Sequence, residues 1–565
     1  MERIAQWTFP VYGYCMSSDY SFDEYLSWRA QTDFWRDDEF LQATIKRYSH
    51  EQWETVDTSL REVSPRLSQD WTALLQVAAR PENAIRLEPY DPYNNRVDRL
   101  VRSAQMEQLE REMFGEALFA DDTSDWVSLV KMGLFLAHGE AGVNCPLACT
   151  AGLVTLLEQF ADRPETLAML EHLKHGVAGH YGRGAQYLTE IQGGSDVAAN
   201  QLRAVRDDDG EWRLYGDKFF CSATQADYSV VTARVTEEDA EDTDDAPGVG
   251  LFVVPSWLPG NAPDGPRNGF TINRLKHKLG SREMPTAELT FDGALAYQLG
   301  RTDRGIANMT RHVLAQSRLN CGLATATGVS RAYREAKQYT QYREAFGVPV
   351  AQFPLVQLQL AQLERASKRY TAGMFRITGD FIRLRSADSY DVSEDRWREQ
   401  FRLRQLIMLS KLVTAEAAPN LYLQAMTLLG ANGMMEDFCD LPRLFRDSVT
   451  NQMWEGPRNI LLTQIFNDLS RHLDRYPPQE LVAELLPTTP ADRVSELGSE
   501  LEAILAHGTL SLPGAGTLNI CERWIGLSET IFHEYCDAAV VDVESHSELP
   551  GGQDRSGAPA AQLPA

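Results

Sequence analysis

Apolar residues recur at helical spacing in two separate parts of the chain. Residues 126–141 place apolar side chains three and four positions apart, as one face of a helix requires. The same spacing returns between about 303 and 470, where Pro354 stands where a helix can start and Gly430 where one can stop. The pattern predicts a helical N-terminal part and a later domain of long helices.

The pattern changes between these parts. Short runs rich in β-branched and aromatic residues follow one another and are separated by turn-rich stretches; they lie at 211–222, 228–235, 250–257 and 287–298. They predict an antiparallel β domain. The acidic stretch 236–248 is typical of a solvated hairpin loop, and 258–269 is a second loop rich in Pro and Gly. Residues 87–98, with two prolines among polar residues, are also predicted to be a loop.

We therefore expect a multi-domain α+β protein. Strands and helices do not alternate, which argues against a Rossmann fold or a TIM barrel. The expected parts are an N-terminal helical domain (1–185), a middle antiparallel β domain (186–300), a C-terminal four-helix bundle (301–470), an appended C-terminal helical region (471–549) and a disordered tail (550–565).

Composition narrows the classes of function. The 565 residues are 43 % hydrophobic and 24 % charged, which is ordinary for a globular protein. A net charge of -26 discourages binding to nucleic acid or anionic membranes. No signal peptide and no apolar run of about 20 residues is found, so we expect a cytoplasmic protein without membrane spans. The eight cysteines have neither zinc-site nor disulfide spacing, which favours free thiols and no bound metal.

A glycine-rich polar segment joins the first helical part to the β domain. Gly193 and Gly194 allow a ligand to approach the backbone closely. Thr189, Gln192 and Ser195 supply hydrogen-bonding groups beside them. Taken alone, the segment fits a simple domain connection equally well.

Two further segments pair an aromatic residue with a polar one. Phe220 and Ser222 lie two apart and share one face of a strand, which suits the edge of a flat heteroaromatic ring. Arg343 and Phe346 lie three apart at a helix end, and arginine suits a diphosphate. An ordinary strand with core aromatics, and a solvated Arg beside a core Phe, are the alternatives.

The last segment contains a candidate base. Gly430 and Gly433 bracket a tight turn whose amides could meet a phosphate. Glu455 lies between Trp454 and Gly456, and a carboxylate held against a large aromatic ring has a raised pKa, as a general base needs. A solvated surface glutamate is the alternative.

Together, the order and spacing of these segments resemble the acyl-CoA dehydrogenase family. The family pattern is TE-x-x-x-GSD, G-x-K-x-aromatic-x-Ser/Thr, R-x-x-FG, G-x-x-G, RD and EG. The matching positions are 189–196, 216–222, 343–347, 430–433, 446–447 and 455–456. The resemblance spans roughly residues 130–470.

The resemblance implies FAD, bound between the β domain and the bundle at a dimer interface of a homodimer or homotetramer. It assigns Glu455 as the catalytic base and Arg318 to the substrate. Its cofactor-binding residues are Thr189, Gln192, Ser195, Phe220, Ser222 and Asn459, with Arg343, Phe346, Gly430 and Gly433 supplied by the neighbouring subunit.

The implied reaction is the oxidation of an acyl thioester of CoA or of a carrier protein. Glu455 removes the α-proton, and a hydride passes from the β-carbon to flavin N5, which leaves an α,β-unsaturated thioester. An acceptor similar to electron-transfer flavoprotein then takes the electrons.

Residues 90–93 and 318–324 and the added C-terminal region resemble the bacterial alkylation-response branch of the family, where that region is associated with DNA binding. Here it is acidic, with four Arg and no Lys against thirteen Asp and Glu over 471–545, which argues against nucleic acid as a partner. Thr427 and Pro457 also depart from the residues common at those family positions. The alternative hypothesis is a low-activity flavoprotein that binds DNA or sequesters acyl ligands.

Overall fold

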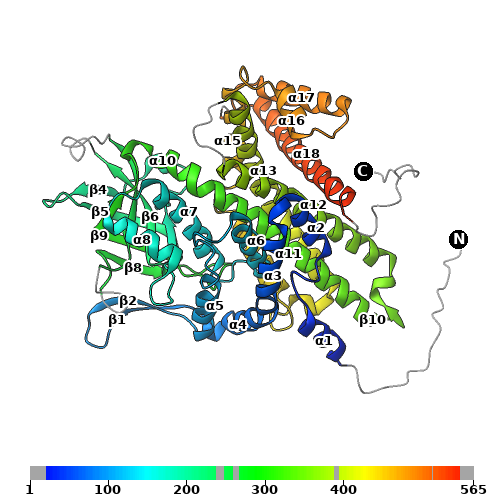
Figure 1. Ribbon diagram of the computed structural model, residues 1–565, viewed down its shortest axis with the longest axis horizontal. Coiled ribbons are helices and arrows are strands. Elements are labelled where there is room, and N and C mark those ends of the chain that lie inside the picture. Colours follow the sequence, from blue (N-terminus) through cyan, green and yellow to red (C-terminus); the bar gives the residue numbers. More distant parts are fainter. Residues whose placement is uncertain (1–20, 237–246, 259–265, 387–392, 512, 548–565) are drawn as a thin grey trace.

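The computed structural model describes residues 21–236, 247–258, 266–386, 393–511 and 513–547. Along the chain it has helices, then a β domain, then two further groups of helices (Figure 1). The predicted α+β class and this order are confirmed. Most of the acidic stretch 236–248, part of 258–269 and the tail 550–565 lie outside the described residues.

The N-terminal part is a layered group of helices. They are α1 (Asp23–Gln31), α2 (Glu39–Ser49), α3 (Trp53–Pro65), α4 (Thr72–Ala78), α5 (Ala104–Phe114), α6 (Asp125–Phe135), α7 (Asn144–Phe160) and α8 (Pro164–His175). Serine hydroxyls cap two of these helices, because Ser103 accepts from the backbone N–H of Met106 and Ser124 from that of Val127.

The predicted loop at 87–98 is instead a hairpin of β1 (Arg86–Tyr90) and β2 (Arg96–Val101). The Pro- and Asn-rich residues form only its turn, where Asp91 accepts from the backbone N–H groups of Tyr93 and Asn95. The flanking strands are short and half-exposed, so they lack the apolar alternation that marks a strand in sequence. Buried Asp98 ties the hairpin to the β domain by accepting from Ile272 N–H at 2.9 Å.

The middle domain is one seven-stranded sheet. Its strands are β3 (Gly184–Tyr187), β4 (Arg203–Arg206), β5 (Trp212–Ser222), β6 (Tyr228–Val235), β7 (Gly248–Pro255), β8 (Phe270–Leu275) and β9 (Thr286–Gln298). Strands β4, β5, β9, β7 and β6 pair in a closed ring around a core that includes Trp212 and Phe252. Most pairings are antiparallel, as expected, but β3 and β4 both lie parallel to β6. The pairing of β3 with β6 places the glycine-rich segment after β3 at the edge nearest the helices.

The second helical domain is built on three long helices that pack against one another. These are α11 (Ala315–Tyr342), α12 (Pro354–Ser386) and α13 (Glu394–Leu428). Helix α10 (Gly305–Asn308) precedes them, and α14 (Leu441–Asn451) and α15 (Arg458–Arg471) follow. Two short strands, β10 (Glu344–Ala345) and β11 (Val348–Pro349), join α11 to α12. Helix α12 starts at Pro354, and α13 ends just before Gly430, which has a φ of 64°.

The appended region is α16 (Pro478–Leu485), α17 (Ala491–Leu505) and α18 (Ala515–Ser545), and α18 packs along α12 (Figure 1). One apolar cluster is continuous from α3 through α12 to α18, with Val63, Phe375 and Phe532 fully buried in it. Trp524 also donates from Nε1 to the Leu462 carbonyl at 3.0 Å. The appended helices therefore share the core of the helical domain.

The crossing of α12 and α18 allows a test of this docking. An added Cβ at Gly373 would lie 2.3 Å from Cys536 Sγ, so Gly373→Val should force the helices apart and lower the free energy of unfolding by about 1–3 kcal/mol. Hydrogen exchange should rise in α18 first. Gly526→Ala is the control, because its Cβ meets nothing within 4 Å, and it should leave stability unchanged or raise it by up to ~1 kcal/mol. Unchanged exchange in α18 of Gly373→Val would contradict this account of the docking.

Candidate active site

Glu455 lies in a strained turn between α14 and α15. Its φ is 56° and that of Gly456 is 95°, so two consecutive residues occupy the left-handed region, which glycine tolerates and glutamate rarely adopts. Two buried cations hold the turn: Arg318 of α11 donates from Nε to the Glu455 carbonyl at 3.0 Å, and Lys411 of α13 donates from Nζ to the Gly456 carbonyl at 2.6 Å. The backbone on either side of the carboxyl group is thereby fixed from two helices.

The two oxygens of the Glu455 carboxyl group differ. Gln186 of β3 donates from Nε2 to Oε1 at 2.9 Å, whereas Oε2 is buried without a partner among the described residues. Burial raises the pKa of Glu455 above its ordinary value, and the charges of Arg318 and Lys411 and the Gln186 hydrogen bond oppose that rise. A partly desolvated carboxylate with one free oxygen is a suitable general base.

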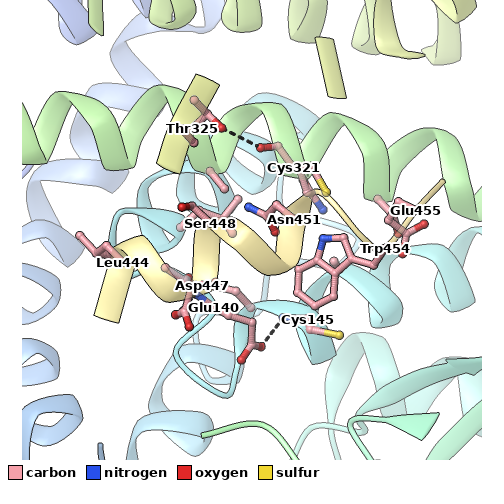
Figure 2. A pocket seen from close by; sticks show the side chains of 18 of the residues that line it. Glu140, Cys145, Cys321, Thr325, Leu444, Asp447, Ser448, Asn451, Trp454 and Glu455 are labelled. Carbon is pink, nitrogen blue, oxygen red and sulfur yellow. Dashed lines mark hydrogen bonds between the residues drawn. The ribbon is translucent and has the colours of Figure 1, made fainter. Parts of the chain in front are cut away.

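That carboxyl group stands at one end of a cavity with about 710 Å³ of empty space, part of which is open to solvent (Figure 2). Helices α11 and α14 form two of its walls, and the segment around Glu140 and Cys145 forms a third. Trp454 lies beside Glu455, as the sequence predicted, and its Nε1 is buried without a partner among the described residues. The cavity can therefore hold a flexible chain next to the base.

A buried ion pair joins the first two predicted segments. Glu190 accepts from Lys218 Nζ at 2.8 Å, and both side chains are almost fully buried. Glu190 also accepts from the backbone N–H groups of Gln201 and Leu202, and Phe219 N–H donates to the Thr189 carbonyl at 2.9 Å. The sequence analysis did not predict an ion pair between Glu190 and Lys218, because sequence alone does not show that a charged pair is buried. The available indication was that both residues lie inside the segments that match the family pattern.

The predicted flavin contacts on this side form an open surface. Thr189 is half-buried, Gln192 and Ser195 are exposed, Phe220 is 50 % exposed, and Ser222 Oγ lies 3.1 Å from Thr286 Oγ1. An added Cβ at Gly194 would lie 2.4 Å from Thr189 Oγ1, whereas one at Gly193 would meet nothing within 4 Å. A turn that requires glycine, open on one side and next to an exposed aromatic ring, fits the edge of a planar ligand.

The structure does not bring the remaining predicted contacts to this surface within one chain. Arg343 and Phe346 belong to the β10–β11 hairpin, at the far end of the long helices from the sheet, and Phe346 is 89 % exposed (Figure 1). Gly430 is exposed and Gly433 is buried in the adjoining turn, which Asn432 ties to Tyr339 by a 2.9 Å hydrogen bond. Asn459 is exposed at the start of α15.

Two residues were missed or given another role by sequence reasoning. Arg318, expected at the substrate, donates to a backbone carbonyl of the turn and to Gln464 Oε1. Lys411 was not expected at the site, since a lysine inside a helix carries no sign of burial; it is 1 % exposed. Both act on the position and charge of Glu455.

Asp447, the acid of the RD segment, joins three parts of the chain. It accepts from the backbone N–H of Ser281 at 2.6 Å and from that of Glu140 at 3.1 Å. Burial and the neighbouring Asp447 charge raise the pKa of Glu140 to about 8. Within the described ranges there is no cluster of His, Cys, Asp and Glu suited to a metal ion, and no helix is long and apolar enough to cross a membrane.

Comparisons with known proteins agree with this arrangement. Residues 185–294 match the middle domain of acyl-CoA dehydrogenases, and residues 303–469 match their C-terminal domain. Acyl-CoA dehydrogenase family member 11 of Caenorhabditis elegans is 29 % identical over 77 % of this chain and 70 % of its own length. The putative acyl-CoA dehydrogenase AidB of Escherichia coli is 31 % identical over 63 % of each chain, slightly under two thirds of its length.

Solved structures extend the similarity to the fold. The C. elegans protein in complex with C11-CoA has a TM-score of 0.75 at 26 % identity, over 91 % of this chain and 88 % of that one. An acyl-CoA dehydrogenase of Bacillus anthracis complexed with FAD has a TM-score of 0.63 at 18 % identity, over 93 % and 82 % of the two chains. The likeness therefore includes the appended helices.

The Glu190–Lys218 pair gives a prediction on stability. Glu190→Gln leaves a buried ammonium group without its counter-charge and should lower the free energy of unfolding by about 3–5 kcal/mol, measured by thermal and denaturant unfolding. The pair holds the pKa of Glu190 below its ordinary value. Its contribution is therefore complete above pH ~4.3 and is lost as the pH falls further, so the two proteins should become more alike in acid.

The matched control is Glu288→Gln, because Glu288 pairs with Lys276 at 2.7 Å on a more exposed strand face and should cost less than ~1 kcal/mol. Equal losses in the two variants would contradict a special role for the buried pair.

Proposed function

The chain belongs to the acyl-CoA dehydrogenase family, and on that premise we propose that it is an FAD-dependent oxidoreductase that converts an acyl thioester to its α,β-unsaturated product. One observation carries the proposal: Glu455, which lines the end of the cavity, has a buried carboxyl oxygen without a partner and a pKa raised by burial. Its place at the cavity distinguishes it from Glu283, which is also buried with an unpartnered oxygen but does not line the cavity.

Glu455 acts as the base. With the acyl chain in the cavity, Oε2 takes the proton from the carbon α to the thioester carbonyl, while Gln186 keeps Oε1 in place. The strained turn fixes the direction of the carboxyl group, since Arg318 and Lys411 hold its two carbonyls. A bound acyl chain would displace water from the cavity beside the reacting carbons.

The residues on the sheet edge fit the proposed cofactor. Thr189, Gln192, Ser195, Phe220 and Ser222 would hold the flavin end of FAD on one chain, and Asn459 lies at the start of α15. The diphosphate and adenine would be held by residues of a second copy: Arg343, Phe346, Gly430 and Gly433. When bound, the flavin supplies the acceptor for the two electrons that leave the substrate. A homodimer or a homotetramer follows from this division of residues.

Related proteins support the choice of partners. The C. elegans structure holds an acyl-CoA and the B. anthracis structure holds FAD, which supports an acyl-CoA or carrier-protein thioester as substrate and FAD as cofactor. An acceptor similar to electron-transfer flavoprotein and a cytoplasmic location complete the proposal. The second candidate, a low-activity flavoprotein that sequesters acyl ligands, is favoured by the relationship to AidB; binding to DNA is opposed by the acidic α16–α18.

Anaerobic mixing of the flavin-loaded protein with a panel of acyl-CoAs tests the proposal. Wild type should lose the visible flavin absorption with one class of acyl chain, and Glu455→Gln should slow that loss at least ~1,000-fold, because the variant has no base. Glu283→Gln is the matched control: Glu283 is buried, has a raised pKa and an unpartnered Oε2, but does not line the cavity, and its variant should still bleach.

Tight acyl-CoA binding with no bleaching of wild type would refute the dehydrogenase and leave the sequestering protein.

Gln186 gives a separate prediction on pH dependence. Its hydrogen bond lowers the pKa of Glu455, so Gln186→Leu should raise that pKa further. The ionised base is the active form, and the bleaching rate falls as the pH drops through the pKa. The acid limb of the rate profile should therefore move to higher pH in the variant. A limb that stays in place, with acyl-CoA affinity unchanged, would show that Gln186 does not act on the base.

A further inference from the structure

The cavity beside Glu455 is lined by polar side chains along both of its helical walls. On α11, Ser317, Asn320 and Thr325 line the cavity, and on α14 Ser448 and Asn451 line it; Figure 2 labels Thr325, Ser448 and Asn451. The rest of the lining is mostly apolar and suits an alkyl chain, so a polar group without a partner marks the place where such a chain would leave a hydrogen bond unmade. The unpartnered polar groups of the lining therefore indicate which kind of acyl group the cavity binds.

Asn320 is the amide in this lining that makes no hydrogen bond inside the protein. It is 5 % exposed, and both its Oδ1 and Nδ2 are buried without a hydrogen-bond partner among the described residues. Two hydroxyl groups of the lining already have acceptors, because Ser448 donates to the Phe445 carbonyl at 2.7 Å and Thr325 to the Thr414 carbonyl at 3.3 Å. A buried amide with neither group satisfied requires a ligand or solvent partner.

The charge of the lining selects among polar ligands. Among the described residues, no lysine or arginine lines the cavity, so a carboxylate on the acyl chain would find no counter-ion there. Besides Glu455, the acidic residues of the lining are already engaged, because Asp447 accepts from two backbone N–H groups and Glu140 accepts from those of Gly142 and Cys145. A neutral hydrogen-bonding group is the chemistry that remains.

We propose that Asn320 is a specificity-determining residue that binds a neutral polar group, a hydroxyl or a carbonyl, on the acyl chain of the thioester. Its amide offers a donor and an acceptor side by side, so one hydroxyl can both accept from Nδ2 and donate to Oδ1. An alkyl chain of equal length leaves both unpaired. The inference rests on the proposed function for the thioester itself, and it narrows the substrate class to functionalised acyl chains.

The test compares hexanoyl-CoA with hexanoyl-CoAs that carry a hydroxyl at the γ, δ or ω carbon. Wild type should prefer one hydroxylated substrate over hexanoyl-CoA by roughly ten- to a hundredfold in kcat/KM, because a site built to hydrogen-bond a hydroxyl rejects the analogue that lacks it. Asn320→Leu should reduce the ratio to about one or invert it, with hexanoyl-CoA gaining.

A matched control separates this role from the loss of any buried amide. Gln405 of α13 is also buried with neither amide atom partnered among the described residues, but it does not line the cavity. Gln405→Leu should leave the ratio unchanged. If Asn320→Leu does not fold, Asn320→Ala replaces it. Thermal unfolding is measured for Asn320→Leu, Asn320→Ala and Gln405→Leu.

A binding measurement distinguishes failure of this inference from failure of the proposed function. Calorimetric affinities of the same thioesters for flavin-loaded Glu455→Gln do not depend on turnover. Tighter binding of a hydroxylated chain, lost when Asn320→Leu is added, supports the inference even if wild type never bleaches. Equal or tighter binding of hexanoyl-CoA, or a ratio that Asn320→Leu leaves unchanged, overturns it even if wild type bleaches normally.

Discussion

The left-handed turn at Glu455 and Gly456 is the constraint on which the site depends. A glutamate at positive φ costs on the order of 1 kcal/mol or more, and it persists only where the surroundings hold it. Here the surroundings are two buried cations from different helices, Arg318 and Lys411, which donate to successive carbonyls of the turn. Buried cations require hydrogen-bond acceptors, and the buried carbonyls of the turn require donors. The two hydrogen bonds satisfy both groups.

The same two cations set the electrostatics of the carboxyl group. Burial raises the pKa of Glu455, whereas the nearby positive charges and the Gln186 hydrogen bond lower that pKa. Gln186 comes from the sheet, Arg318 from α11 and Lys411 from α13, so the pKa of the base depends on how the β domain docks on the helices. Asp447 of α14 contributes to that docking, because it accepts from the backbone N–H of Ser281 in the β domain and from that of Glu140 in the N-terminal part.

The appended helices stand apart from this chemistry. None of the residues that line the cavity comes from α16–α18, and these helices share their apolar core with α12 and the N-terminal helices. Their acidic surface faces away from that core. They extend the core of the helical domain, whereas the cavity is lined by residues of α7, α11, α13 and α14 and of the segments beside α7 and α14.

The sequence by itself determined the fold class and the order of its parts, and it named Glu455 as the proposed base, because periodicity, turn residues and six short segments are local signals. It placed Pro354 at a helix start and Glu455 beside Trp454. It missed the β1–β2 hairpin, whose half-exposed strands carry no alternation. Tertiary structure alone decided that Lys411 and Arg318 hold the turn, that Glu190 is paired with Lys218, and that Asn320 is buried without a partner. Burial and pairing arise between residues distant in sequence. The sequence therefore does not show whether a charged or amide side chain is exposed to water or buried in the protein core.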